Sequence, residues 1–326
     1  GTVGRIQEGI NLVSGSTVNV ANGTYYESNT VIDKSMTLQG ESRTGVVIAP
    51  AAEDTGLGWS KTDGNPQNGL IVQASSVTIR SLTIDGSANN LAQGGSLPDH
   101  YNFRHGIRLA DGADYNNVTV DSVNVVNIRR RGILLYPTTG YLGPYSVTNS
   151  HVAHVEYQNA ISIGSVNATI VGNTLDDVNN AISLHPPVSH PDTGATATVS
   201  GNTITNLGHV RHAEVYPPTG VYYRNPNDDR KIVAENNSIT GANNVAAPIA
   251  FYIYNANSQS RIANNQVNLA PLTSIDPSVP SGGTYGNFAW SYPLGIYLGG
   301  CAGTRVEDNT ITLYGTGSGI YLGRGA

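Results

Sequence analysis

Arginine, histidine and tyrosine residues gather in a few short segments of a chain that is otherwise poor in charge. Only 12% of the residues are charged and the formal net charge is −6, yet Arg129, Arg130 and Arg131 are consecutive. Most of the histidines lie in the segments 87–105 and 208–218 or in the strands predicted beside them. A local excess of cationic side chains on an anionic protein favours a specific anionic ligand over general attraction to polyanions. Uronic-acid polysaccharides are ligands of that class.

β-Elimination on a uronate needs groups that these residues can supply. Arginine neutralises the C6 carboxylate well, because its guanidinium holds a carboxylate through two parallel hydrogen bonds. A base then removes the C5 proton and an acid protonates the leaving O4 atom; histidine, tyrosine or arginine can serve at hydrogen-bond distance. The catalytic candidates for this reaction are His105, Arg108, Arg131, His212 and Tyr222. The three consecutive arginines also fit a solvated corner, because successive strand residues cannot all face one way.

Two other functions stay open. Glycoside hydrolysis would use two carboxylates, and those near the same segments are Glu156, Asp176, Asp177 and Glu214. The adjacent aspartates are expected to hydrogen-bond at a corner, since strand geometry sends only one of them outward. Glu214, close to His212, is the better candidate for a catalytic acid. A non-catalytic carbohydrate-binding, adhesin or filament-type surface module is the other alternative. We favour the polysaccharide lyase.

A five-residue phrase recurs along the chain and sets the architecture that must position these side chains. Its copies begin at Val171, Ser200, Glu235, Ala263 and Glu307, and each has Asn in third place. Such repetition signals a solenoid, because one repeat cannot bury its apolar face alone. The phrases alternate apolar and polar residues with the period of strands, and Gly, Asn and Asp supply corners. We therefore expect a parallel β-helix whose Asn side chains hydrogen-bond from coil to coil.

A second phrase, small–apolar–polar–apolar, predicts which side chains share one face. Alternation places its second and fourth residues inside and its third outside. The predicted outward column is Arg108, Leu134, Ser162, Ser183, Tyr222, Tyr252, Tyr297 and Tyr321, and two residues further on the same face adds Tyr136, His185, Arg224 and Tyr254. We call these two columns the lateral wall. It changes from basic to aromatic along its length, as a track for an extended ligand would. The substrate-binding candidates are Tyr136, Glu156, His185, Arg224, Tyr252, Tyr254 and Tyr297.

The segments 16–27 and 36–40, with the repeats that follow, resemble the start of the pectin-lyase-like superfamily of right-handed parallel β-helices. The resemblance covers nearly the whole chain. It implies an all-β fold, a single right-handed solenoid of about ten coils. The same scaffold carries polysaccharide lyases, glycoside hydrolases, esterases, epimerases and non-catalytic surface proteins. The resemblance therefore implies a poly- or oligosaccharide partner and a secreted or cell-surface location, while no motif of a specific family is matched.

The predicted organisation is one domain over residues 1–326. Residues 1–15 form an N-terminal cap with a short helix, and loop excursions cover 87–105, 208–218 and 270–293. Long loops on a rigid scaffold are where function is usually found. Both ends of the sequence look cut from a longer polypeptide, and uncapped ends of a solenoid invite self-association by strand addition.

Composition and motifs exclude several classes of function. A pI of about 5.7 argues against nucleic-acid binding, and no run of about 18 apolar residues could span a membrane. The single cysteine, Cys301, excludes an intrachain disulfide. Zinc-binding, nucleotide-binding and EF-hand motifs are absent, so no cofactor is expected. A Ca²⁺ ion held by Asp99, Asp111 or Asp114 stays open, without a motif to support it.

Overall fold

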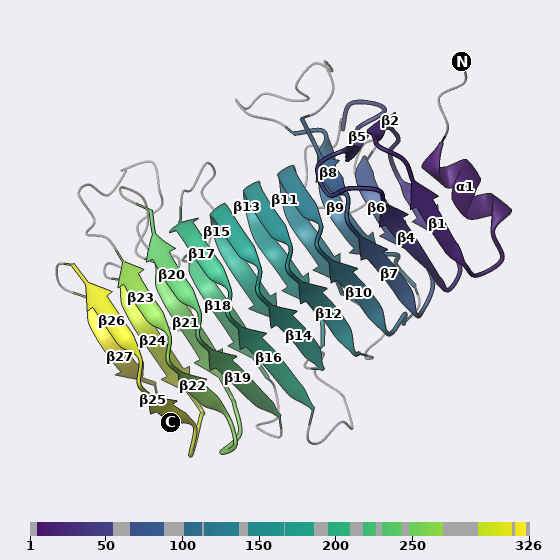
Figure 1. Cartoon of the computed structure of the whole chain (residues 1–326). Helices are drawn as coiled ribbons and strands as arrows, with labels where there is room; N and C mark the ends of the chain where they lie inside the picture. Colours follow the sequence, from purple (N-terminus) through teal and green to yellow (C-terminus); the bar gives the residue numbers. More distant parts are fainter. Residues whose placement is uncertain are drawn as a thin grey trace.

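The strands of the computed structural model wind into a long stack of coils, with one short helix at the N-terminal end (Figure 1). The structure describes residues 5–54, 66–87, 101–112, 114–136, 143–165, 167–185, 195–208, 218–225, 230–242, 248–269, 293–314 and 317–323. All pairings between strands of successive coils are parallel. The prediction of a right-handed parallel β-helix is confirmed. In the described part of the chain, no helix is long and apolar enough to cross a membrane.

The first face of the solenoid is a sheet of ten strands, one from each coil, which agrees with the predicted number of coils. Its strands, in spatial order, are β1 (Thr17–Val20), β4 (Met36–Gly40), β7 (Val77–Arg80), β10 (Val118–Asp121), β12 (Tyr145–Thr148), β14 (Ala168–Val171), β16 (Thr196–Ser200), β19 (Lys231–Glu235), β22 (Arg261–Ala263) and β25 (Arg305–Glu307). Apolar and polar residues alternate along them, and the apolar ones are buried in the interior of the solenoid.

The remaining strands make two further faces. The second face contains β2 (Gly23–Tyr26), β5 (Val46–Ala49), β8 (Thr83–Asp85), β17 (Thr203–Leu207), β20 (Ser238–Gly241), β23 (Gln266–Leu269) and β26 (Thr310–Leu313). The third face contains β3 (Thr30–Ile32), β6 (Asn68–Val72), β9 (Phe103–Leu109), β18 (Thr219–Arg224), β21 (Ile249–Tyr254), β24 (Leu294–Gly299) and β27 (Ser318–Leu322). The strands β11 (Asn124–Leu135), β13 (His151–Ile163) and β15 (Thr174–Leu184) run through both faces.

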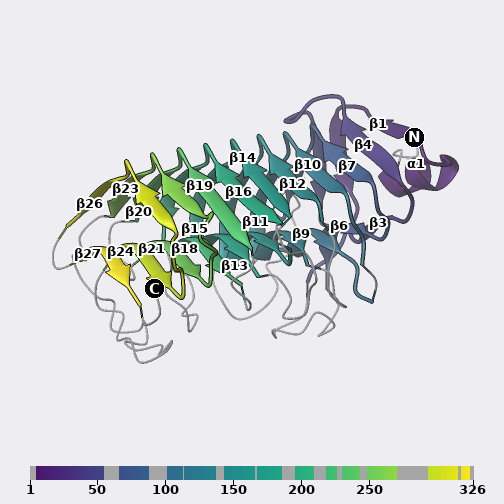
Figure 2. The ribbon, with the colours of Figure 1, turned by 90° about the horizontal axis from the view of Figure 1, so that it is seen from below.

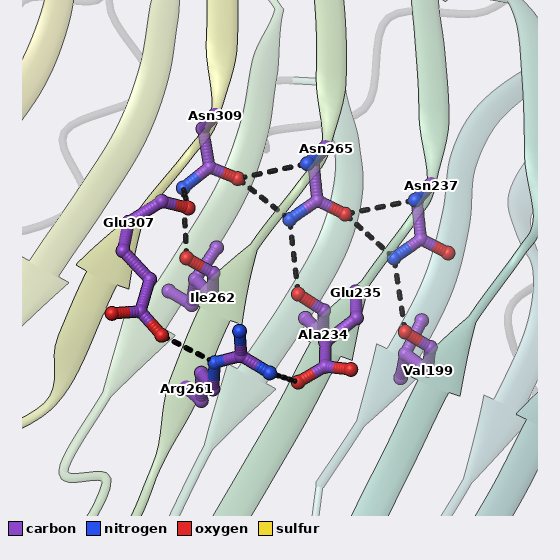
Figure 3. Close-up of polar contacts among 9 residues, drawn as sticks. All are labelled: Val199, Ala234, Glu235, Asn237, Arg261, Ile262, Asn265, Glu307 and Asn309. Atoms are coloured by element: carbon purple, nitrogen blue, oxygen red, sulfur yellow. Dashed lines mark hydrogen bonds and ion pairs between the residues drawn. The ribbon is translucent and has the colours of Figure 1, made fainter.

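The predicted asparagine ladder lies at the corner between the first and second faces. Asn237 donates from Nδ2 to Oδ1 of Asn265 at 2.9 Å, and Asn265 donates in the same way to Asn309 at 2.8 Å (Figure 3). The residue before each ladder asparagine has a positive φ, for example 62° at Gly201 and 56° at Asn236. Glycine and asparagine reach this region at little cost, so the repeated phrase is the sequence of a tight corner.

The third face begins with an inward bend that explains the small residue of the second phrase. A Cβ atom on Gly106 would lie 2.3 Å from Cγ1 of Val125, and one on Gly132 would lie 2.5 Å from Cγ1 of Val152. The small residue and the apolar residue after it therefore both face the interior. Strict alternation is therefore broken immediately before the lateral wall in these coils, as it is at Gly220 and Gly295.

The two ends of the stack differ in how they are covered. At the N-terminal end, α1 (Ile6–Leu12) buries Ile6 and Ile10, and Glu27 accepts hydrogen bonds from the first helical N–H groups. The expected capping helix is therefore present. In the last coil, Ile320 and Leu322 are 52% and 65% exposed. Self-association through such an end stays a prediction.

The predicted loop excursions fall largely outside the described residues. Phe103 to His105 of the first excursion already belong to β9, because they pair with the neighbouring strands. The other two excursions are represented by their edges alone, among them Gly208, Pro218 and Pro293. The prediction of a single domain stays a prediction.

Candidate functional site

The outward column of the lateral wall is one continuous line of the register. Each predicted member lies opposite the next on the following coil. The pairs are Arg108 with Leu134, Leu134 with Ser162, Ser162 with Ser183, Ser183 with Tyr222, Tyr222 with Tyr252, Tyr252 with Tyr297 and Tyr297 with Tyr321. The strands that carry this column, from β9 to β27, follow one another along the lower side of the solenoid in Figure 2. Leu134, Ser162, Ser183 and Tyr297 are buried, so the column is accessible at Arg108 and at Tyr222, Tyr252 and Tyr321, each of which is half-buried.

Five aromatic rings stack along the C-terminal half of the wall. His185 stacks on Tyr222 with ring centroids 4.5 Å apart, and Tyr222 stacks on Tyr252 at 5.1 Å. Tyr252 stacks on Tyr297 at 4.5 Å and Tyr297 on Tyr321 at 5.6 Å, with planes within 10° of parallel. Each ring follows the spacing of the strands beneath it. We call this row the ring ladder.

The stacking decides which part of each ring a ligand can meet. Inner rings of the ring ladder cover one another's faces, so the wall offers ring edges and hydroxyl groups instead of open aromatic faces. Burial, with contributions from the neighbouring tyrosines, raises the pKa of Tyr252, and burial raises the pKa of Tyr297. Both hydroxyls are therefore uncharged at neutral pH. A sugar chain lying on the ladder would meet a row of neutral hydrogen-bonding groups.

The other end of the wall is strongly basic. His105 is only 1% exposed, and neither of its ring nitrogens has a hydrogen-bond partner among the described residues. Burial lowers its pKa well below the usual range, and the charges of Arg131, Arg130, Arg108 and Arg104 lower it further. A neutral imidazole thus lies within reach of four guanidinium groups. We call these five residues the arginine cluster.

A buried ion pair anchors one side of the arginine cluster. Arg104 donates from Nε and Nη2 to the two carboxylate oxygens of Asp54, at 3.1 and 2.8 Å. Nη1 of Arg129 lies 3.7 Å from the same carboxylate, and all three side chains are buried. Arg130 is buried as well, which corrects the solvated-corner interpretation of the three consecutive arginines. Two of these buried cations, Arg104 and Arg129, are balanced by the carboxylate of Asp54.

The arginine cluster and the ring ladder are joined through His185. Burial lowers the pKa of His185 to about 4, and the nearby charges of Arg224 and Arg131 contribute to the shift. Arg131 belongs to β11 and His185 follows β15, so their interaction crosses the coil of β13. His185 is therefore close enough to feel the charge of Arg131 in the arginine cluster while its ring stacks on the first tyrosine of the ladder.

The half-buried imidazole of His185, with its lowered pKa, predicts a pH dependence of stability. Its pKa of about 4 lies below the ordinary value of 6.5, so the unfolded chain binds the proton more readily. Stability that is present above about pH 6.5 is then lost as the pH falls. Between about pH 8 and about pH 5 we expect the free energy of unfolding to decrease by about 2 kcal/mol because of this residue. Urea unfolding of the wild type and His185→Gln over this range measures the effect; parallel pH profiles would contradict it.

Two of the four carboxylates considered for hydrolysis, Asp176 and Asp177, are engaged in other contacts. Oδ1 of Asp176 accepts hydrogen bonds from Thr205 at 2.5 Å and Asn206 at 2.8 Å, the corner role expected for it. Asp177 pairs with Nδ1 of His154 at 2.6 Å. Glu156 is buried. The described part of the wall therefore offers no free pair of carboxylates, and Glu214 lies outside it.

Of the remaining predicted site residues, all but His212 lie within the described part of the chain. Arg108 is mostly buried and forms an ion pair with Asp111, from Nη1 to Oδ2, at 3.2 Å. Arg224 is exposed, Tyr136 and Tyr254 are half-buried, and His212 lies outside the described residues. Sequence reasoning missed Asp54, because no local pattern links it to an arginine 50 residues away. Among the described residues, no cluster of His, Cys, Asp and Glu could hold a metal ion.

Comparisons with known proteins find similarity of fold only. Neither a protein-family model nor a curated protein matches the sequence. The virus protein ORF18 of Geobacillus virus E2 is 12% identical, with a TM-score of 0.45, over 97% of this chain and 57% of its own. The pectin methylesterase PemA of Erwinia chrysanthemi is 17% identical, with a TM-score of 0.48, over 73% and 76% of the chains. The tailspike gp49 of Acinetobacter baumannii bacteriophage Fri1, a capsular polysaccharide depolymerase, is 14% identical, with a TM-score of 0.44, over 97% and 60%. This chain thus spans 57% and 60% of the lengths of the two viral proteins.

Proposed function

We propose that this protein binds an extended acidic polysaccharide along the lateral wall and cleaves it by β-elimination at the arginine cluster. The observation that supports this proposal is the register from Arg108 to Tyr321, a column with an arginine at one end and four tyrosines at the other, the first of which stacks on His185. Rows of such groups on a rigid scaffold suit a linear polymer, because each coil presents its side chains at the same spacing. A polymer of this kind is met outside the cell, so we expect a secreted or cell-surface protein.

The proposed elimination assigns a task to each group. Arg108 and Arg131 bind the C6 carboxylate of a uronate and so make its C5 proton more acidic. His212 is the candidate for the base or the acid. Tyr222 lies four strands along the column from Arg108, at about 4.8 Å per strand, and so is too far away to act on the sugar that Arg108 binds. The base takes the C5 proton, the freed electron pair forms the C4=C5 double bond, the C4–O4 bond breaks and the acid gives O4 a proton. His105, buried and neutral among the arginines, acts as a positioning residue for them.

The first experiment follows the ultraviolet absorbance of the unsaturated uronate product over a panel of acidic polysaccharides, with and without Ca²⁺. A reducing-sugar assay on neutral glycans runs beside it. We expect absorbance to rise on at least one uronan and the rate to fall at least about tenfold in Arg131→Ala, a loss of about 1.4 kcal/mol of transition-state stabilisation. Arg305→Ala, which removes an exposed arginine from β25 on the first face, is the matched control and should cleave normally.

The outcomes separate the alternatives. Binding of a glycan without new reducing ends or absorbance would exclude the elimination and favour the non-catalytic surface module. New reducing ends without absorbance would favour hydrolysis. Equal losses in Arg131→Ala and Arg305→Ala would show that the arginine effect is not local to the wall.

A further inference from the structure

The coil formed by β25, β26 and β27 exposes apolar side chains at positions that the coil before it buries. Ile296 and Leu298 of β24 are 0% and 5% exposed, whereas Ile320 and Leu322, which lie opposite them on β27, are 52% and 65% exposed. Among the described residues, no strand pairs with the free sides of β25, β26 and β27. Exposed apolar side chains beside unpaired strand edges favour contact with another chain.

The opposite end of the solenoid is covered by α1 (Figure 1). Ile6 and Ile10 of the helix are buried, and Glu27 accepts hydrogen bonds from its first N–H groups. A second copy therefore cannot stack its N-terminal coil on the open end without displacing this helix. Two copies can instead join their open ends, and such an assembly closes at two because each copy has one open end.

The backbone of β25 shows how two open ends can pair. The N–H group of Arg305 donates to the carbonyl oxygen of Ser260 at 3.0 Å, and the carbonyl oxygen of Glu307 accepts from the N–H group of Asn264 at 3.3 Å. Successive strand residues direct their backbone groups to opposite edges, so the N–H and C=O groups of Val306 face the open edge. A two-fold axis through Val306 makes the two copies exchange two hydrogen bonds, as an antiparallel pair does.

The same axis brings opposite charges together. It places Arg305 directly opposite Glu307 of the partner subunit, in a pair whose Cα atoms are about 4.5 Å apart. Both side chains are exposed, and Arg305 has no ion-pair partner among the described residues. Glu307 accepts a hydrogen bond from Arg261 through Oε1 (Figure 3), and a carboxylate can accept more. Opposite charges at such positions stabilise antiparallel strands.

We propose that this chain forms an end-to-end dimer in which β25 pairs antiparallel with β25 of a second copy about a two-fold axis. The axis is normal to the first face, so the interiors of both copies lie on one side of the joined sheet and their exposed apolar side chains meet. The arginine cluster lies on β9 and β11, away from this interface. Arg305→Ala therefore weakens the dimer and remains a control for cleavage.

Sedimentation velocity over a range of protein concentrations tests the dimer. We expect the wild type to approach twice the 34.2 kDa mass of one chain as the concentration rises. Arg305→Glu and Glu307→Arg should each weaken association at least about tenfold, because two attractive pairs become two repulsive ones. An equimolar mixture of these two variants should regain the association, because every opposed pair then again joins an acidic and a basic residue.

Arg80→Glu is the matched control, because it makes the same change of charge at an exposed position of the first face on β7, far from the open end. It should associate like the wild type; equal weakening by Arg80→Glu and Arg305→Glu would overturn the opposed pairs. A wild type that keeps the mass of one chain at every concentration would overturn the dimer and leave the open end to a partner of another sequence. A mass that grows beyond two chains would overturn the closed two-fold arrangement. Failure of the mixture to associate, with both variants folded by circular dichroism, would overturn the register through Val306.

Discussion

Replacement of Asn237 by alanine is expected to lower the free energy of unfolding by about 4–5 kcal/mol. Oδ1 of Asn237 accepts hydrogen bonds from N and Nδ2 of Asn202 at 3.1 and 3.0 Å. Its Nδ2 donates to the carbonyl oxygen of Val199 and to Oδ1 of Asn265, both at 2.9 Å. The substitution removes all four bonds and leaves buried donors of Asn202 without a partner. Unsatisfied buried groups cost more than the loss of an exposed hydrogen bond.

Asn309→Ala is the matched control because Asn309 makes the same kind of contacts at the end of the ladder. Its Oδ1 accepts from N and Nδ2 of Asn265 at 3.0 and 2.8 Å, but the residue is only half-buried. Water can replace the lost partner there, so we expect a loss of about 1–2 kcal/mol. Urea unfolding followed by circular dichroism measures both variants. Equal losses would show that the ladder contributes through the corner geometry and not through its buried hydrogen bonds.

The fold was predictable because the sequence pattern of one coil is repeated several times along the chain. Each copy of the asparagine phrase marks the same corner, and the residues before Asn237 and Asn265 both have a positive φ. Side chains alternate with a period of two along each strand, so aligning the phrases also predicts which side chains share a column. The column from Arg108 to Tyr321 was predicted in this way. Repetition thus turns a weak local signal into a reliable one.

The candidate site was less predictable because its properties depend on neighbours from other coils. Alternation indicates direction and not exposure, so it could not show that Ser162 and Ser183 are buried. Nor could it show that the tyrosine rings cover one another's faces, which changes what a ligand meets. The buried charge of Asp54 had no local signal at all. His212 lies outside the described residues, and its role stays a prediction.

Removal of the Asp54 carboxylate should be nearly as damaging as the loss of Asn237, for an electrostatic reason. Asp54→Ala is expected to lower the free energy of unfolding by about 3–5 kcal/mol, the usual cost of leaving one half of a buried ion pair without its partner. Arg104 would lose two hydrogen bonds to the carboxylate, and Arg129 its nearby charge. Both arginines would then remain buried beside the other cations of the arginine cluster.

Two further variants separate charge from packing in this pair. Asp54→Asn keeps the shape and one acceptor oxygen, so it should cost less than Asp54→Ala. Arg104→Leu combined with Asp54→Leu should recover part of the loss, because Arg104 no longer leaves an unpaired buried charge, while Arg129 still loses the nearby carboxylate. Urea unfolding of the single and double variants gives the coupling energy. A double variant as unstable as the sum of the single ones would contradict the argument. Recovery of stability without recovery of polysaccharide binding would show that the pair also orients the arginines that meet the substrate.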